Sequence, residues 1–123
     1  MEENRIIILA ENRVMAPGLM GEHGLALWIE FRGKKLLFDT GQGMVLKNNM
    51  AALKLEGREL DYVLLSHGHY DHTGGLMDLE HKDGLPVLGH DCLFRSQYSQ
   101  DGEGKLKDIG PPYKREDLEE RGF

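Results

Sequence analysis

The chain has 123 residues, of which 40% are hydrophobic and 29% are charged, and its formal net charge is −6 at pH 7. This length suits one domain with one core, and the composition is that of an ordinary globular protein rather than a disordered chain. Lys and Arg are scattered among acidic residues and form no basic stripe, which argues against a nucleic-acid partner.

The first half of the chain alternates short apolar runs with glycine-rich breaks, a pattern that indicates strands joined by loops. In chain order it predicts a buried strand at 5–10, a loop at 11–24, a hairpin of strands at 25–31 and 34–40, and a helix at 44–57. The helix is predicted because Leu46, Met50 and Leu53 are spaced to share one face. Gly57 is the predicted C-terminal cap of that helix.

The second half predicts shorter elements joined by polar segments. These are a strand at 60–66, a short helix at 74–82, a turn at 83–84, a buried strand at 85–89, a short helix at 90–98, a polar loop at 99–112 and a charged helix at 113–123. Strands that alternate with helices indicate an α/β domain, and the hairpin makes its β-sheet mixed, with helices flanking the sheet. The charges of the final helix are interpreted as a solvated surface.

Cys92 is the only cysteine, so the chain has no intramolecular disulfide and no sign of a secreted, cross-linked scaffold. Its thiol is either a metal ligand or nucleophile, or a small buried apolar group, and the second role is the commoner one. The apolar run near the start is too short for a signal peptide, and no stretch approaches the ~20 apolar residues of a membrane span. We therefore expect a soluble cytoplasmic protein without a membrane partner.

Three of the six histidines lie in "HGHYDH", residues 67–72, directly after a predicted strand. Alternate residues of an extended segment point the same way, so His67 and His69 can converge on one point, and Asp71 and His72 on another close by. Imidazole nitrogens and carboxylate oxygens suit Zn²⁺ and related ions at about 2.0–2.2 Å. Sites in α/β sheets gather beyond the carboxyl ends of strands, where this cluster begins. The sequence therefore predicts a site for up to two divalent ions.

Such a site favours hydrolysis of a small-molecule substrate, because a metal ion lowers the pKa of water toward ~7 and polarises carbonyl or phosphoryl oxygens. Asp71 is the predicted catalytic residue, since it could orient or deprotonate that water while it binds the second ion. Zinc is the expected metal, and manganese or iron would accept the same ligands. His81 and His90 have no partners at metal-ligand spacing and are interpreted as residues outside the site.

The motif "SHGHYDHTGG" resembles the His-x-His-x-Asp-His signature of the metallo-β-lactamase superfamily, and "LLFDTG" resembles the Asp-Thr-Gly that precedes it there. Residues 21–43, 60–76 and 108–122 are together similar to a subgroup of dihydropterin–ribofuranosylaminobenzene 5'-phosphate synthase-like proteins. The resemblance implies half of a four-layer αββα sandwich. It also implies a metal-dependent hydrolase or transferase that acts on a small substrate, phosphorylated or pterin-like.

The resemblance implies metal-binding roles for the residues of the cluster. His67 and His69 would hold the first metal ion, and Asp71 and His72 would hold the second. A histidine at position 69 also favours the hydrolase-like branch, because the oxygen-reducing diiron members of the superfamily usually carry glutamate there.

The same resemblance implies roles for two residues outside the cluster. Asp39 would orient the metal-binding loop from the second shell, whereas the alternative is an acid that only caps the turn at Thr40 and Gly41. His23 would line the substrate-binding side of the site, whereas the alternative is an ordinary surface histidine.

The chain departs from the superfamily in its missing second half, which there supplies a third histidine, a bridging aspartate and a final histidine to the metal sites. After His72 this chain has only His81 and His90, so residues 1–123 are expected to form a single, truncated domain. The chain would then be a fragment of a longer protein, a short product that pairs with itself or with another chain, or a domain that holds metal weakly without catalysis. The functions left open are an enzyme, a non-catalytic metal-binding domain that self-associates or pairs with a complementing half, and a purely structural domain.

Overall fold

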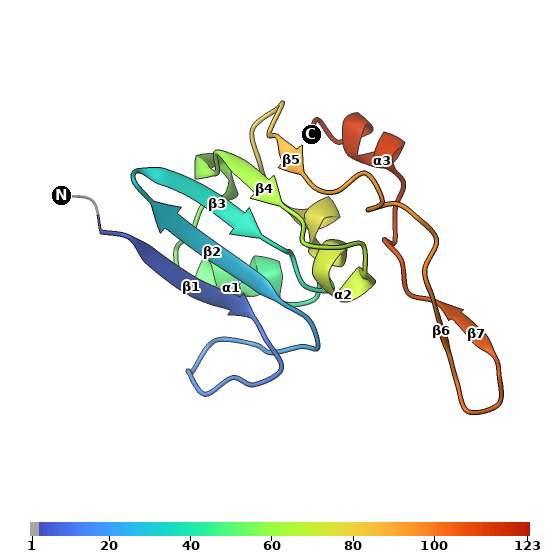
Figure 1. Ribbon diagram of the computed structural model, residues 1–123. Coiled ribbons are helices and arrows are strands. Elements are labelled where there is room, and N and C mark those ends of the chain that lie inside the picture. The colour runs from blue at the N-terminus through green and yellow to red at the C-terminus, as the bar shows by residue number, and fades with distance from the viewer. Residues whose placement is uncertain (1–2) are drawn as a thin grey trace.

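A computed structural model gives the structure of the chain and describes residues 3–123. The main β-sheet contains β1 (Arg5–Ala10), β2 (Ala26–Phe31), β3 (Lys34–Phe38), β4 (Tyr62–Leu64) and β5 (Val87–Leu88). The strands lie in that spatial order, with antiparallel pairing from β1 to β3 and parallel pairing from β3 to β5 (Figure 1). The predicted α/β fold with a mixed sheet and flanking helices is confirmed.

The helices of the structure are short. They are α1 (Leu46–Ala52), η1 (Gly57–Glu59), α2 (Tyr70–Thr73), η2 (Gly74–Asp78) and α3 (Arg115–Glu120). A separate two-stranded hairpin of β6 (Tyr98–Gln100) and β7 (Leu106–Asp108) projects away from the main sheet (Figure 1). Within residues 3–123, no helix has the length and apolar character that crossing a membrane requires.

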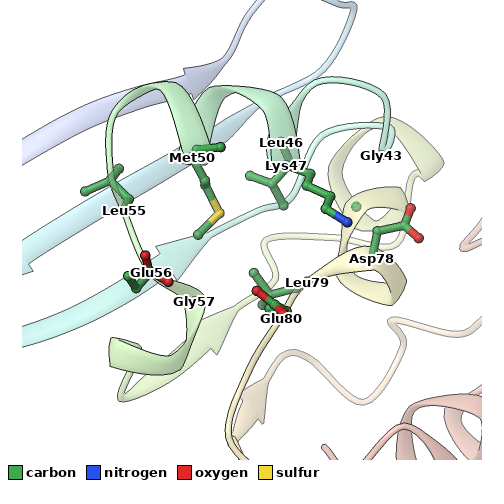
Figure 2. Close-up of a pocket in the computed structure, with 12 residues that line it drawn as sticks. Gly43, Leu46, Lys47, Met50, Leu55, Glu56, Gly57, Asp78, Leu79 and Glu80 are labelled. Carbon is green, nitrogen blue, oxygen red and sulfur yellow. The ribbon is translucent and has the colours of Figure 1, made fainter.

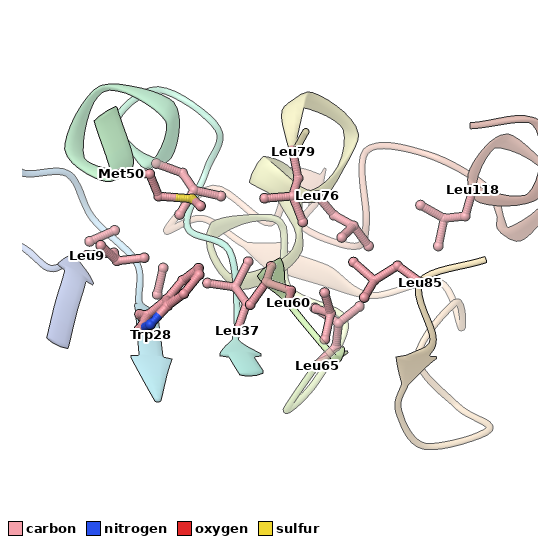
Figure 3. Close-up of a cluster of buried hydrophobic side chains, with 14 of the residues drawn as sticks. Leu9, Trp28, Leu37, Met50, Leu60, Leu65, Leu76, Leu79, Leu85 and Leu118 are labelled. Atoms are coloured by element: carbon pink, nitrogen blue, oxygen red, sulfur yellow. The ribbon is translucent and has the colours of Figure 1, made fainter. Parts of the chain in front are cut away.

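The core lies between the main sheet and the layer that contains α1 and η2. One row of paired residues faces this layer and runs across all five strands through Ile7, Trp28, Leu37, Val63 and Val87. Met50 of α1 and Leu76 of η2 pack against that row (Figure 3). Burial of one such side chain stabilises the fold by about 1.5–3 kcal/mol. The packing of this row therefore holds β3 and β4 in place beside each other.

The opposite face of the sheet, here called the open sheet face, also carries apolar side chains. Two rows of paired residues form it, through Ile6, Ile29, Leu36 and Tyr62, and through Ile8, Leu27, Phe38, Leu64 and Leu88. Ile6 is 65% exposed, Ile8 57% and Leu88 49%. Both predicted strands exist, the first at its predicted length as β1 and the second only as the two residues of β5. The prediction that they are buried is wrong for the side chains on this face.

The predicted hairpin at 25–31 and 34–40 is confirmed as β2 and β3. Its turn consists of Arg32 and Gly33, whose φ angles of 49° and 75° are both positive. Two positive φ angles define the type I′ turn, whose twist matches that of the paired strands.

The helix predicted at 44–57 is correct in place but too long. α1 ends at its C-cap Leu53, and Lys54 follows in the left-handed conformation with φ 56°. The N–H of Leu55 then donates to the carbonyl of Met50 at 2.8 Å, which closes the helix end. Gly57 is therefore not the helix cap, and instead it begins η1.

The predictions after residue 73 are less accurate. The helix expected at 74–82 is replaced by the single 3-10 helix η2, and residues 91–94, expected to be helical, form turns. The expected loop at 99–112 contains most of the β6–β7 hairpin, and the final helix is only α3. The strands β6 and β7 are exposed throughout, whereas η2 and α3 each bury a leucine, Leu76 and Leu118, in the core. Contacts with distant parts of the chain therefore decide where these short helices form.

Candidate metal centre

Two segments meet at one edge of the main sheet because β3 and β4 are parallel neighbours. Asp39, Thr40 and Gly41 directly follow β3. Two residues separate the end of β4 from the histidine cluster. The backbone N–H of Asp39 donates to the carbonyl of Leu64 at 2.9 Å, and that of Thr40 donates to the carbonyl of His72 at 2.7 Å. The structure thus brings together residues 39–41 and 67–72 at the carboxyl ends of β3 and β4. Functional sites of open α/β sheets usually gather at that end of the strands.

The cluster is extended only in its first part. His69 has extended φ and ψ angles, and its carbonyl accepts hydrogen bonds from the backbone N–H groups of His72 and Thr73 at 3.0 and 3.1 Å. The chain therefore turns helically at α2 and returns His72 to the side of His67. The ring centroid of His67 lies 4.2 Å from that of His72 and 4.6 Å from that of His69. The three rings therefore lie side by side, but only His67 and His72 belong, with Asp39, to the described group whose ligand atoms lie within 4.8 Å of one another.

Asp39 lies fully buried beneath these rings. Its Oδ1 accepts the backbone N–H of Ser66 at 2.8 Å, and its Oδ2 accepts the Ser66 hydroxyl at 2.5 Å and the Nδ1 of His72 at 2.7 Å. Its φ of 55° is left-handed, a conformation that aspartate tolerates better than most residues and that is often found at functional sites. The carboxylate thus connects the end of β3 to the histidine cluster.

This network determines which nitrogen of two histidines carries the proton. The Ser66 hydroxyl has one hydrogen and gives it to Asp39, so the 2.8 Å contact between Ser66 Oγ and His67 Nδ1 requires that Nδ1 be the donor. The Nδ1 of His72 likewise donates to Asp39. In the neutral form of either ring, Nε2 is then the unprotonated nitrogen, which is the one that binds a metal ion.

Ser66 takes part in this hydrogen-bond network, and the sequence predictions missed it. The signal that could have found it is its position directly before the first histidine of the motif, at the end of the predicted strand. At that position a hydroxyl can accept from one imidazole and donate to a carboxylate at the same time.

The electrostatics of the cluster also favour neutral imidazole. Partial burial lowers the pKa of His67, and the neighbouring His72 and His69 lower it further. A histidine must be neutral to bind metal, so the lowered pKa favours the metal-binding form at neutral pH.

Asp71 supplies a carboxylate beside the three rings. It is 8% exposed, and its Oδ2 lies 3.6 Å from His72 Nε2 and 3.1 Å from His23 Nε2. His23 therefore reaches Asp71 from the loop before β2, with a side chain that is 67% exposed.

The donor set fits a divalent cation. Asp39, His67 and His72 each offer a ligand atom within 4.8 Å of the other two. The oxygens of Asp39 are already hydrogen-bonded to Ser66 and His72. Among the described residues, His69 and Asp71 lie beside this group but are not part of it. The imidazole nitrogens and carboxylate oxygen of the group are a donor set of the kind that zinc accepts.

The remaining histidines and the cysteine occupy other surroundings. His81 stacks on Phe123 with ring centroids 3.8 Å apart, and the Nδ1 of His90 accepts the backbone N–H of Cys92 at 3.1 Å. His90 and the half-buried Cys92 line a cavity of 410 Å³ beside His67, together with Ser66, Gly68, Leu93, Arg95 and Gln97.

A different cavity, of 210 Å³, lies between α1, η1 and η2 (Figure 2). Apolar side chains of Leu46, Met50, Leu55 and Leu79 line it, and both positive and negative side chains surround it, namely Lys47, Glu56, Asp78 and Glu80. The histidines are not among its lining residues, as far as the described part of the chain goes. The group of described side chains that could hold a metal ion lies instead at the edge of the sheet.

Comparison with known proteins agrees with this geometry. Residues 20–115 match the family described as the Metallo-beta-lactamase superfamily. The uncharacterized protein MJ0448 of Methanocaldococcus jannaschii is 34% identical over 96 residues, which cover 76% of this chain and 37% of that protein. The 7,8-dihydropterin-6-methyl-4-(beta-D-ribofuranosyl)-aminobenzene-5'-phosphate synthase of the same organism is 32% identical over 108 residues, which cover 82% of this chain and 37% of the synthase.

A solved structure from the same superfamily also matches this chain. Tm1679, a metal-dependent hydrolase of the beta-lactamase superfamily, matches with a TM-score of 0.69 and 29% identity, over 89% of this chain and 37% of its own. This chain thus spans 37% of the length of each of these three relatives. The family match covers most of the chain and includes both the Asp-Thr-Gly segment and the histidine cluster, so the predicted resemblance is confirmed. The chain belongs to the metallo-beta-lactamase superfamily.

Proposed function

We propose that this chain carries the metal-binding part of a cytoplasmic, metallo-β-lactamase-fold enzyme of the hydrolase or transferase type. The observation that carries the proposal is the hydrogen-bond network of Asp39 and Ser66, which engages the Nδ1 atoms of His67 and His72 and so leaves Nε2 of each neutral ring free. A purely structural domain has no need to orient imidazoles in this way. The cytoplasmic location rests on the single cysteine, which argues against a cross-linked secreted protein.

In this proposal His67 and His69 hold the first of up to two ions, and Asp71 and His72 hold the second. Zinc is the preferred metal, because neutral imidazole and carboxylate suit it, although manganese and iron accept the same donors. When bound, a divalent ion supplies a Lewis acid and lowers the pKa of water toward about 7.

The protein's own residues would then have separate tasks. Asp71 would orient the attacking water and accept its proton, since its carboxylate lies at the cluster while the carboxylate of Asp39 is occupied below it. Ser66 and Asp39 would fix the orientation of the imidazoles through the Nδ1 atoms of His67 and His72, respectively.

The substrate in this proposal is a small molecule that carries a phosphate or a pterin-like ring. Its support is the name of the synthase from M. jannaschii, whose product name contains both a dihydropterin and a phosphate, and the 32% identity that this chain shares with it. Fold alone does not fix a substrate, so the chemistry of binding must be measured.

Metal content tests the proposal. We expect the purified chain to bind zinc, and we expect a His67→Ala/His69→Ala double variant to lose the ion at the first position, because two of its ligands are gone. Elemental analysis beside the intact mass gives the stoichiometry, and a chromogenic phosphodiester or ester reports turnover. His81→Ala/His90→Ala is the matched control, since it removes two histidines outside the cluster. Equal zinc in the wild-type chain and the His67/His69 variant would refute the proposed metal site.

A second candidate function has its own observation, the open sheet face. Ile6, Ile8 and Leu88 are each about half or more exposed along a continuous apolar surface, and such surfaces usually mark an interaction site. We propose as the alternative a non-catalytic metal-binding domain, in which a second copy of this chain packs sheet against sheet, with a complementing second half as the other possible partner.

Sedimentation velocity distinguishes the two candidates. If the alternative holds, the chain sediments as a dimer at micromolar concentration, and Ile8→Lys shifts it to the monomer because a charge would be buried in the interface. Met15→Lys is the control, because Met15 is 90% exposed in the loop after β1. A monomeric chain with full metal occupancy and turnover would exclude the alternative.

A further inference from the structure

The cavity beside His67 is formed where the segment 92–97 lies directly against the histidine motif. A Cβ atom at Gly68 would lie 2.1 Å from the carbonyl oxygen of Leu93 and 2.8 Å from Nε2 of Gln97. Both distances are shorter than a real Cβ atom allows, so only glycine at this position of the motif permits the approach. The sequence of the motif is therefore specific for this neighbouring segment as well as for its histidines.

Backbone hydrogen bonds hold the same segment in place. The N–H of Arg95 donates to the carbonyl of Cys92 at 3.0 Å, and the carbonyl of Gln97 accepts the N–H of Ile109 at 2.9 Å. The carbonyl of Ile109 in turn accepts the N–H of Tyr70 at 3.0 Å, so the contact returns to the motif. Arg95 and Gln97 thus line the cavity from a backbone that is fixed relative to the histidines.

The cavity is positively charged in a chain whose formal net charge is −6. As far as the described residues go, Arg95 lines it and no aspartate or glutamate does. The ion pairs found within residues 3–123 do not involve Arg95. Asp108 lines a neighbouring cavity with Arg95, but its Oδ1 accepts the N–H of Gly110 at 2.9 Å. The guanidinium of Arg95 is therefore available to a negative group that enters the cavity.

The size and the donors of the cavity suit a small oxyanion-bearing molecule. Its volume of 410 Å³ falls in the range of about 300–1,000 Å³ that is usual for ligand sites. A guanidinium binds phosphate or carboxylate through two parallel hydrogen bonds, and the amide of Gln97 can donate another. Arg95 is exposed, so a molecule can reach it from solvent. His67 lines the same cavity and belongs to the metal-binding group, so a molecule bound there lies beside the candidate metal centre.

We infer that this cavity is the anion subsite of the substrate, in which Arg95 binds a phosphate or carboxylate group and Gln97 is a second donor. The inference rests on the proposed function and deepens it, because it names the group by which the small molecule is held and the residues that select it. It also adds a specificity-determining residue that the sequence predictions did not include.

Titration calorimetry of the zinc-loaded, full-length chain with phenyl phosphate, benzoate and neutral benzamide tests the inference without any turnover. We expect one or both anions to bind more tightly than benzamide, and Arg95→Gln to weaken the tighter anion by about tenfold or more, because a charged hydrogen-bond donor is lost. Arg95→Lys should restore part of the affinity, since lysine supplies the charge without the planar fork. The anion that loses affinity in Arg95→Gln identifies the group as phosphate or carboxylate.

Arg58→Gln is the matched control, because it removes the same charge from η1, away from the cavity. It should bind both anions like the wild-type chain. Zinc content is measured in every sample, and circular dichroism establishes that each variant is folded.

The outcomes separate this inference from the proposed function. If the wild-type chain holds zinc and Arg95→Gln binds both anions as tightly as the wild type, the role of Arg95 is overturned while the metal site stands. Anions that bind no better than benzamide overturn it as well. If the wild-type chain holds no zinc, the proposed function itself fails and the inference falls with it.

Discussion

Replacing Asp39 with alanine is expected to lower the free energy of unfolding by about 3–5 kcal/mol. The carboxylate is fully buried and accepts hydrogen bonds from the backbone and hydroxyl of Ser66 and from His72. Its removal leaves these donors without partners, and alanine is also unfavourable at a φ of 55°. Urea denaturation followed by circular dichroism measures the change.

Asp39→Asn separates stability from metal binding. Asparagine keeps the size of the side chain and tolerates the left-handed backbone, but it lacks the charge that holds the Nδ1 proton of His72. We expect this variant to fold and to bind zinc about 10–100-fold more weakly, as measured by competition with a chromogenic chelator. Zinc affinity equal to that of the wild-type chain would show that Asp39 does not orient the ring for binding.

The second large effect is expected at Gly75, directly after the motif. A Cβ atom there would lie 2.0 Å from the carbonyl oxygen of Thr40 and 3.1 Å from Cδ2 of Leu46. The carbonyl belongs to the backbone and cannot rotate away, so Gly75→Ala should destabilise the fold by about 3 kcal/mol. Thr40 holds the His72 carbonyl through its N–H at 2.7 Å and its hydroxyl at 2.9 Å, so zinc affinity should fall as well.

Gly102→Ala is the matched control for that substitution. A Cβ atom at Gly102 would meet no atom within 4 Å, counted over the described residues. We expect its unfolding free energy to stay within about 0.5 kcal/mol of the wild-type value, as is usual at exposed sites. A Gly75→Ala chain that unfolds at the same urea concentration as Gly102→Ala would contradict the close packing of η2 on the Asp-Thr-Gly segment.

The metal cluster could be predicted from the sequence because its residues are neighbours in the chain. His67, His69, Asp71 and His72 carry their own spacing signal, and the structure brings the three imidazoles side by side, although by the helical turn of α2 rather than by alternation along an extended segment. The network beneath them could not be predicted from spacing, since Asp39 is 27 residues from Ser66 and 33 from His72. Only the parallel pairing of β3 with β4, a contact between distant segments, places that carboxylate under the rings.

The fold shows the same division between local and distant determinants. The β2–β3 hairpin was predictable because its two apolar runs and turn are contiguous, and long-range pairing was not required to recognise it. The end of α1 was not predictable, because a lysine at position 54 adopts the left-handed conformation that glycine usually supplies. Gly57 gave a false signal, since a Cβ atom there would lie 1.8 Å from the carbonyl oxygen of Glu80, and this close approach is its reason for being glycine.

The anchoring of two imidazoles from below has a consequence for how the protein captures an ion. The bonds from Asp39 and Ser66 to the Nδ1 atoms involve protein groups alone, so folding itself restricts the conformational freedom of the two rings. Capture therefore requires desolvation of the cation and little rearrangement of the receptor, and preorganisation of this kind favours tight, fast association.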